Sequence, residues 1–218
     1  MNLQKGKEGG ADKMQKALKI TLATGNKHKT DEVNLICRDY NIEFILPEGE
    51  FKPMENGKSF LENAYCKAKY ASKNGKTRLY LADDSGLCVD ALKGEPGIYS
   101  ARYAQTQEKR IEKLLFNMKN TDKIKDRKAE FVCAMVVVDK NANILFKTEQ
   151  KCKGYIIKEK RGSNGFGYDP VFFIDEKQKT MAQLSKEEKN KISHRAKSLN
   201  MVLNWLKNEY RKYGEYEY

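Results

Sequence analysis

The first half of the chain alternates short apolar runs with stretches of helical spacing. Residues 18–24 (LKITLAT) predict a short strand that ends at the turn GNK. In the following KTDEVNLICRDY, apolar Val33, Ile36 and Cys37 recur at helical spacing, and IEFIL at 42–46 predicts a second strand. The pattern over residues 18–46 therefore predicts strand, loop, helix and strand.

A second helix and a third strand follow a polar loop that Pro and Gly interrupt. SFLENAYCKAKYAS begins with Ser59 and Glu62 at the spacing of a capping box, which predicts a helix to about Asn74. RLYLAD at 78–83 has the apolar character of a strand that is buried on both faces. The Asp-Asp-Ser-Gly that comes next predicts that this strand ends in a turn at residues 83–86.

The second half of the chain has longer strand patterns and ends in helical sequence. TQEKRIEKLLFNMKN predicts an amphipathic helix, and AEFVCAMVVVD and NILFKTEQKCKGYII predict a hairpin around KNAN. VFFI is a further short strand. Ser185 and Glu188 again have capping-box spacing, and helical sequence continues to about Tyr210 with a break near Ser193.

The order βαβαβ, then a hairpin, then helices predicts an α/β protein with a mixed, twisted sheet. Flanking helices would cover the sheet, with two lobes and a central cleft where they meet. Residues 18–210 would form this single domain, after a flexible leader at 1–17 and before a tail at 211–218.

Composition narrows the class of partner without identifying it. The net charge of +12 favours an anionic partner, but lysines occur from Lys5 to Lys212 instead of gathering on one element, which argues against a nucleic-acid footprint. Five cysteines without a C-x-x-C pair argue against zinc and indicate reduced thiols in a cytoplasmic protein. No apolar run approaches the ~18 residues of a membrane span, and residues 1–17 lack the apolar core of a secretory signal.

Two glycine-containing segments are candidates for ligand binding. TGNKHK at 24–29 joins a strand to a helix, where backbone N–H groups can hold an anion and Lys29 can add charge. It matches neither a Walker A loop nor a dinucleotide-binding fingerprint, and an ordinary turn fits it as well. GSNGFGYDP at 162–170 combines glycines with Phe166 and Tyr168, which suits a loop that closes over a planar ligand, or a plain hairpin loop with an aromatic plug.

The adjacent carboxylates Asp83 and Asp84 are the strongest candidates for chemistry. Neighbouring side chains of an extended chain point to opposite sides, so one carboxylate can orient the backbone while the other faces a crevice. Two carboxylates this close repel each other unless a cation relieves them, and Mg²⁺ does so well. A solvated turn is the alternative. Glu55 and Glu62 are further carboxylates nearby, although Glu62 has a capping role.

Taken together, these segments resemble a known enzyme family. TGNKHK, ENAYCKA, LADDSGLCVDAL, GIYSARYA, GFGYDPVFF and SHRAKSL, in this order and at these separations, closely resemble the inosine/xanthosine triphosphate pyrophosphatases that remove non-standard purine nucleotides. The resemblance covers roughly residues 18–208. It implies a two-lobed mixed α/β sheet, usually a homodimer, that uses Mg²⁺ to split ITP, dITP or XTP into a monophosphate and pyrophosphate.

The resemblance also implies roles for individual residues. Asp84 matches the proton acceptor and metal ligand, and Glu55 matches a second metal ligand. The residues that match substrate-binding positions are Thr24, Gly25, Asn26, Lys27, His28, Lys29, Lys67, Ser85, Phe166, Gly167, Tyr168, Asp169, Lys189, His194 and Arg195. Whether Asp83 is a second catalytic carboxylate or the residue that fixes the turn stays open.

Selectivity would come from the base. Hypoxanthine and xanthine carry a carbonyl at position 6, which backbone N–H groups of the glycine-rich loop or Arg195 can meet, whereas adenine presents an amino donor there. Two alternatives stay open. One is a pyrophosphatase of similar fold for pyrimidine or modified nucleotides, like the septum-formation-inhibitor family. The other is a basic nucleic-acid-binding protein, which is disfavoured because paired carboxylates would repel a phosphate backbone.

Overall fold

The structure is a computed structural model that describes residues 17–209. The leader predicted at 1–17, apart from Ala17, and the tail predicted at 211–218 lie outside the described residues. The strands are β1 (Leu18–Leu22), β2 (Ile42–Ile45), β3 (Leu79–Val89), β4 (Lys128–Val138), β5 (Ile144–Ile156), β6 (Phe172–Ile174) and β7 (Lys179–Thr180). The α-helices are α1 (Lys27–Ile36), α2 (Phe60–Asn74), α3 (Gln107–Asn117), α4 (Lys186–Ile192) and α5 (His194–Asn208).

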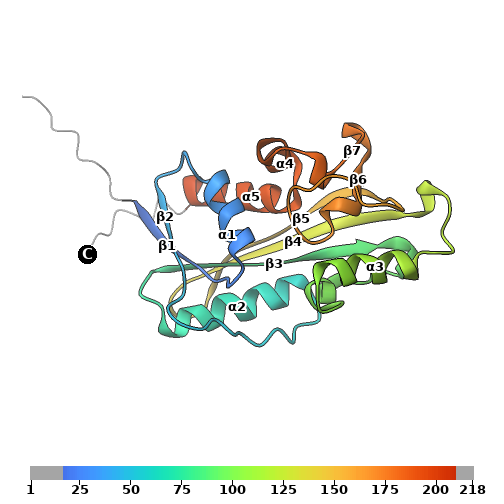
Figure 1. Cartoon of the computed structure of the whole chain (residues 1–218). Coiled ribbons are helices and arrows are strands. Elements are labelled where there is room, and N and C mark those ends of the chain that lie inside the picture. The colour runs from blue at the N-terminus through green and yellow to red at the C-terminus, as the bar shows by residue number, and fades with distance from the viewer. Residues whose placement is uncertain (1–16, 210–218) are drawn as a thin grey trace, which may run out of the picture.

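All seven strands form one mixed sheet in the order β2-β1-β3-β4-β5-β6-β7. β2, β1 and β3 are parallel, whereas β3 to β7 pair in antiparallel fashion. Figure 1 shows α1 and α5 on one side of the sheet and α2 on the other. The predicted α/β class and the mixed sheet with flanking helices are confirmed, and so is the helical break at Ser193. No helix within residues 17–209 is long and apolar enough to cross a membrane.

The strand β3 is longer than its sequence predicts. The expected turn at residues 83–86 was wrong: the strand continues to Val89, with Asp83 opposite Met135 and Asp84 opposite Ala134 of β4. The physical reason is that β4 pairs with β3 from Tyr80 to Val89 and satisfies its backbone groups. The acidic pair therefore lies in the middle of a strand, on rigid backbone.

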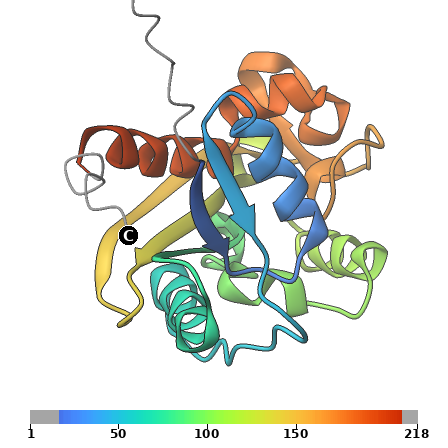
Figure 2. The same cartoon turned by 90° about the vertical axis from the view of Figure 1, so that its left-hand side faces the viewer.

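Side chains of β3 alternate between two separate packing layers. Tyr80 and Ala82 pack in one cluster with Ala64, Ala68 and Ala71 of α2, whose small side chains let the helix approach the sheet closely. Leu79 and Leu81 belong to the cluster on the opposite face, with Leu199, Val202 and Leu203 of α5. In the end-on view of Figure 2, β1 and β2 lie between α2 and α5. By this alternation Asp83 faces the α1 and α5 side, and Asp84 faces the α2 side.

The 3₁₀ helix η2 (Gly97–Arg102) packs directly against β3 at Gly86. A Cβ at Gly86 would lie 2.5 Å from Oγ of Ser100 and 2.9 Å from the ring of Phe60, and would also collide with the carbonyl of Gly97. Ser100 itself accepts a 2.8 Å hydrogen bond from the backbone N–H of Leu87. Glycine is therefore needed here for close approach.

We predict that Gly86→Ala lowers the free energy of unfolding by about 1–3 kcal/mol, because η2 must move away from β3. Urea unfolding followed by circular dichroism measures this. The control is Gly25→Ala, where the added Cβ would meet its nearest atom, the carbonyl oxygen of Phe51, at an ordinary 3.8 Å. Equal unfolding midpoints for the two variants would contradict the packing argument.

Candidate active site

The candidate site lies where β1 ends and β3 continues. β1 pairs with β3 only over residues Leu79–Leu81, so the next residues of β3 have no strand partner on that side within the described chain. In the sheet, β1 lies between β2 and β3, so the strand order reverses direction at β1. Ligands of α/β proteins bind at the carboxyl end of a strand where the order reverses. The acidic pair borders this position.

The segment Thr24–Lys29 occupies the carboxyl end of β1, as predicted. Asn26 caps α1, because its side-chain oxygen accepts hydrogen bonds from the backbone N–H groups of His28 (3.0 Å) and Lys29 (3.4 Å). The hydroxyl of Thr24 accepts from the N–H of Asn26 at 3.1 Å. Two N–H groups expected to face an anion therefore have a partner in the chain, and the Lys29 side chain is the group that reaches the acidic pair. Gly25 and Lys27 are exposed.

Asp83 is the centre of a buried ion-pair network on the α1 and α5 side. Its Oδ2 lies 2.9 Å from Nζ of Lys29 and accepts a 3.2 Å hydrogen bond from Nη2 of Arg195. The same Arg195 nitrogen donates to Oγ of Ser85 at 2.8 Å. Burial alone would raise the pKa of Asp83, but Lys29 and Arg195 outweigh it and hold the pKa well below its ordinary value. Asp83 is therefore a permanent anion that fixes two cations.

Asp84 belongs to a different network on the α2 side. Its two oxygens accept hydrogen bonds of 3.0 Å from Nζ of Lys67 and 3.0 Å from Nδ2 of Asn63. Lys67 also lies 3.3 Å from Oε1 of Glu55, which comes from the loop before α2. Burial would lower the pKa of Lys67, but Asp84, with Asp83 and Glu55, raises it above its ordinary value. Lys67 thus stays charged between two carboxylates.

A third network surrounds the ring of Phe166. Lys189 lies 2.8 Å from Glu32 and 2.6 Å from Asp169, and Glu32 also pairs with Arg195. Burial would raise the pKa of Glu32, but Arg195 and Lys189 lower it. Nζ of Lys189 is 5.0 Å from the centre of the Phe166 ring. Charged groups and one aromatic ring therefore meet in a single small volume.

The glycine-rich loop is held by its own polar contacts. The N–H of Phe166 donates to Asp169 at 2.9 Å, and the N–H of Gly167 donates to Oε1 of Gln107 at 2.7 Å. The hydroxyl of Tyr168 donates to the carbonyl of Ser100 at 3.0 Å. These contacts fix Phe166, whose ring stacks on that of His28 at 5.1 Å. The N–H groups of Phe166 and Gly167, two of those expected to meet a base carbonyl, therefore already have partners.

His194 is a predicted residue whose side chain is buried outside these networks. Its imidazole is buried and stacks on Phe131 in the core at 4.9 Å, and its Nδ1 has no hydrogen-bond partner. Burial, with nearby Arg195 and Lys189, holds its pKa well below the ordinary value, so the ring is neutral. Its neighbour Arg195 is the member of the SHRAK segment that enters the site.

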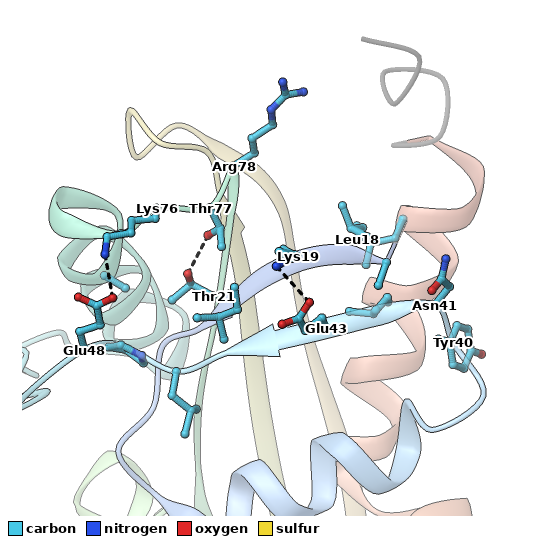
Figure 3. Close-up of a pocket in the computed structure, with 18 of the residues that line it drawn as sticks. Leu18, Lys19, Thr21, Tyr40, Asn41, Glu43, Glu48, Lys76, Thr77 and Arg78 are labelled. Carbon is cyan, nitrogen blue, oxygen red and sulfur yellow. Dashed lines mark hydrogen bonds and ion pairs between the residues drawn. The ribbon is translucent and has the colours of Figure 1, made fainter. Parts of the chain in front are cut away.

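A separate hollow of about 1860 Å³ lies near the opposite end of β1 (Figure 3). Its lining includes the ion pairs Lys19–Glu43 and Lys76–Glu48. The hydroxyls of Thr21 and Thr77, which also line it, share a 2.7 Å hydrogen bond. None of the predicted site residues lines this hollow. The candidate chemistry is therefore located by charged side chains and not by this hollow.

The chain matches a known protein family over most of its length. The model of the Ham1 family matches residues 20–205. The chain is 43% identical over 198 residues to a Treponema denticola protein named dITP/XTP pyrophosphatase, covering 87% of this chain and 99% of that one. A Clostridium perfringens protein of the same name is 43% identical over 201 residues, covering 87% and 97%.

The chain belongs to the Ham1 family. Among solved structures it is similar to the Ham1 protein of Staphylococcus aureus, with a TM-score of 0.77, 41% identity and coverage of 88% and 99% of the two chains. A HAM1 protein from Coxiella burnetii gives a TM-score of 0.76 at 39% identity, covering 87% and 98%. The family resemblance stated from the sequence motifs is confirmed.

Three residues of the candidate site in this Ham1 chain were not predicted from the sequence: Glu32, Asn63 and Arg102. Glu32 lies three positions after Lys29 on α1, and Asn63 lies four positions before Lys67 on α2, so each shares a helix face with a predicted residue. The helical spacing from a predicted residue was therefore the sequence signal that could have identified Glu32 and Asn63. The third, Arg102 at the end of η2, lies 3.7 Å from Oε2 of Glu55 and gave no periodic signal.

The Asp84 network suits one hard divalent cation bound together with phosphate. Asp84 and Glu55 approach the same Lys67 nitrogen at 3.0 Å and 3.3 Å, so their oxygens converge. No group of three or more Asp, Glu, His or Cys residues within the described chain forms a complete cage. Mg²⁺ commonly uses one or two carboxylates and takes its other ligands from water and substrate phosphates. The donor set therefore fits Mg²⁺.

We predict that Asp83→Asn lowers the free energy of unfolding by about 3–5 kcal/mol near pH 7, because Lys29 and Arg195 lose their buried anion. The folded-state pKa of Asp83 is lowered, so its stabilisation is present above the unfolded pKa of about 3.9 and is lost as pH falls through the folded value. Urea unfolding from about pH 7 to pH 2 should show the difference from wild type shrinking below about pH 4.

The matched control for this prediction is Asp122→Asn, which removes an exposed pair with Lys158 at 2.7 Å and should change stability little. A wild-type-like unfolding curve for Asp83→Asn at pH 7 would contradict the role of Asp83 as a buried counter-ion.

Proposed function

We propose that this protein hydrolyses ITP, dITP and XTP to the nucleoside monophosphate and pyrophosphate with Mg²⁺. The observation that carries the proposal is the division of charged groups across β3, with Asp84, Glu55 and Lys67 on one face and the Phe166 cluster on the other. A nucleotide that crosses the unpaired edge of β3 would place its phosphates on the first side and its base on the second. The names of the Treponema and Clostridium relatives support the same activity.

The phosphate side must neutralise a triphosphate of about four negative charges before water can approach phosphorus. Asp84 and Glu55 would hold Mg²⁺, which when bound neutralises phosphate oxygens and polarises the bond to be broken. Lys67 and Lys29 would bind phosphate oxygens with the ammonium N–H donors that their carboxylate partners leave free. Because both lysines are already anchored within 3.0 Å of a carboxylate, little side-chain ordering is required on binding.

Asp84 is the residue positioned to handle the proton. Asn63 and Lys67 fix both of its oxygens, and rigid β3 backbone fixes its Cα, so the carboxylate has a defined direction. It would orient the attacking water and accept its proton as that water adds to the α-phosphorus and pyrophosphate leaves. Asp83, tied to Lys29 and Arg195, serves instead as a positioning residue.

Base selectivity would come from Lys189. An ammonium group has three N–H donors, of which Glu32 and Asp169 take two, so one is left for an acceptor on a base stacked near Phe166. The carbonyl at position 6 of hypoxanthine or xanthine supplies that acceptor, whereas the amino group of adenine would leave a donor facing a donor. Four of the five N–H donors of Arg195 face Asp83, Ser85 and Glu32, which leaves one Nη1 donor, so Arg195 is the alternative donor for this contact.

We further propose a homodimer, as the resemblance implies, and a cytoplasmic protein that binds no nucleic acid and no membrane, as the composition and motifs indicate. These points stay predictions.

We predict that the purified protein with Mg²⁺ converts ITP, dITP and XTP to monophosphate and pyrophosphate about 10³-fold faster than ATP, because a mismatched buried donor is costly. Chromatography of the products across ITP, dITP, XTP, ATP, GTP and dUTP measures this. Orthophosphate as the first product, equal rates on ATP, or preference for dUTP would overturn the proposal. Chelation of the metal should abolish turnover.

We predict that Asp84→Asn lowers kcat by at least about 100-fold while the fold survives, because the amide neither accepts the proton nor holds the metal as well. Product assays and circular dichroism should be run together. Asp90→Asn, which alters an exposed carboxylate just after the same strand, serves as the matched control and should keep full activity. Near wild-type kcat in Asp84→Asn would show that the catalytic assignment is wrong.

A further inference from the structure

Arg102 is a charged residue at the edge of the phosphate side that has no role in the mechanism above. Its Nη1 lies 3.7 Å from Oε2 of Glu55, whose other oxygen lies 3.3 Å from Lys67. Lys67 in turn lies 3.0 Å from Asp84. The guanidinium is therefore paired directly with one candidate metal ligand, Glu55, and lies near the second, Asp84.

The backbone that carries Arg102 is firmly anchored. Ser100 of η2 bonds the N–H of Leu87 at 2.8 Å and the carbonyl of Gly97 at 2.6 Å, and its own carbonyl accepts from Tyr168 at 3.0 Å. The missing side chain at Gly86 lets η2 lie directly on β3. The position of the Arg102 backbone relative to Asp84 is thus fixed by the sheet.

The side chain of Arg102, in contrast, is free to change partners. The Arg102 side chain is 48% exposed and that of Glu55 is 30% exposed, so their ion pair at 3.7 Å is weak and exchangeable. Its guanidinium also lies 5.6 Å from the ring of Tyr99, which supports it from one side. A guanidinium with this freedom can give up a carboxylate and bind phosphate oxygens with two parallel hydrogen bonds.

The direction of the nucleotide identifies which phosphates Arg102 would meet. The base cluster around Phe166 and Lys189 lies on the α1 side of β3, and Lys29 reaches Asp83 on that same side. Asp84 and Glu55 lie across the strand, and Arg102 lies beyond Glu55. A chain of three phosphates that begins near Lys29 and passes Asp84 would end at Arg102.

We propose that Arg102 binds the two terminal phosphates of the substrate and, after cleavage, the pyrophosphate product. The proposal rests on the proposed function for the direction of the nucleotide. It assigns Arg102 to the leaving group, whereas Lys189 and Phe166 serve the base and Lys29 the α-phosphate.

The test compares Arg102→Met and Arg102→Lys with Arg38→Met, a matched loss of an exposed arginine just beyond the C-terminal end of α1. Pyrophosphate and IMP are used as product inhibitors of ITP hydrolysis, because IMP lacks the phosphates assigned to Arg102. In Arg102→Met, the inhibition constant of pyrophosphate and the KM of ITP should rise about tenfold over wild type. The inhibition constant of IMP should stay within about twofold of the wild-type value. For Arg102→Lys, the inhibition constant of pyrophosphate should lie between those of wild type and Arg102→Met. For Arg38→Met, all three constants should match wild type.

Two results would overturn the proposal: an unchanged inhibition constant for pyrophosphate, or equal increases for pyrophosphate and IMP, which would indicate a general disturbance of η2. Wild-type protein without ITP hydrolysis would instead refute the proposed function. In that event, calorimetric titration of magnesium pyrophosphate into wild type and Arg102→Met still decides the point. Loss of binding in the variant supports the role of Arg102, and equal binding or no binding to either protein refutes it.

Discussion

The alternation of side chains along β3 is the constraint on which the rest of the site depends. Because Asp83 and Asp84 are neighbours in one strand, they point to opposite faces of the sheet, and each has separate partners there. β1 stops before it would cover this part of β3, so both carboxylates border the same unpaired edge. The negative charges of Asp83 and Asp84, although adjacent in sequence, are therefore neutralised by different cationic side chains.

The two sides of β3 differ in how deeply their ion pairs are buried. On the α1 and α5 side, Arg195 is only 2% exposed and pairs with buried Asp83 and with Glu32, an arrangement that cannot rearrange without exposing uncompensated charge. On the α2 side, Glu55 is more exposed and its partners are readily exchanged. This difference suits a rigid pocket that selects the base and an adaptable one that takes up metal and phosphates.

Sequence patterns located most of the elements and most of the site, with failures that have physical causes. The turn expected at Asp83–Gly86 was wrong because local preference for Asp, Ser and Gly in turns was overridden by pairing with β4, some fifty residues away. Glu32 was missed because its partners Lys189 and Arg195 come from the other end of the chain. His194 was chosen with Arg195 as a pair, yet neighbours on a helix point in different directions, and only Arg195 enters the site.

In this proposal one nucleotide crosses the edge of β3, with its base on one face and its phosphates on the other. A crystal structure of the Asp84→Asn variant with ITP would show this arrangement. We predict the hypoxanthine ring against Phe166 within hydrogen-bond distance of Lys189, and the terminal phosphates beside Lys67 on the α2 side. A base bound on the α2 side, or a nucleotide held wholly on one face of β3, would contradict it.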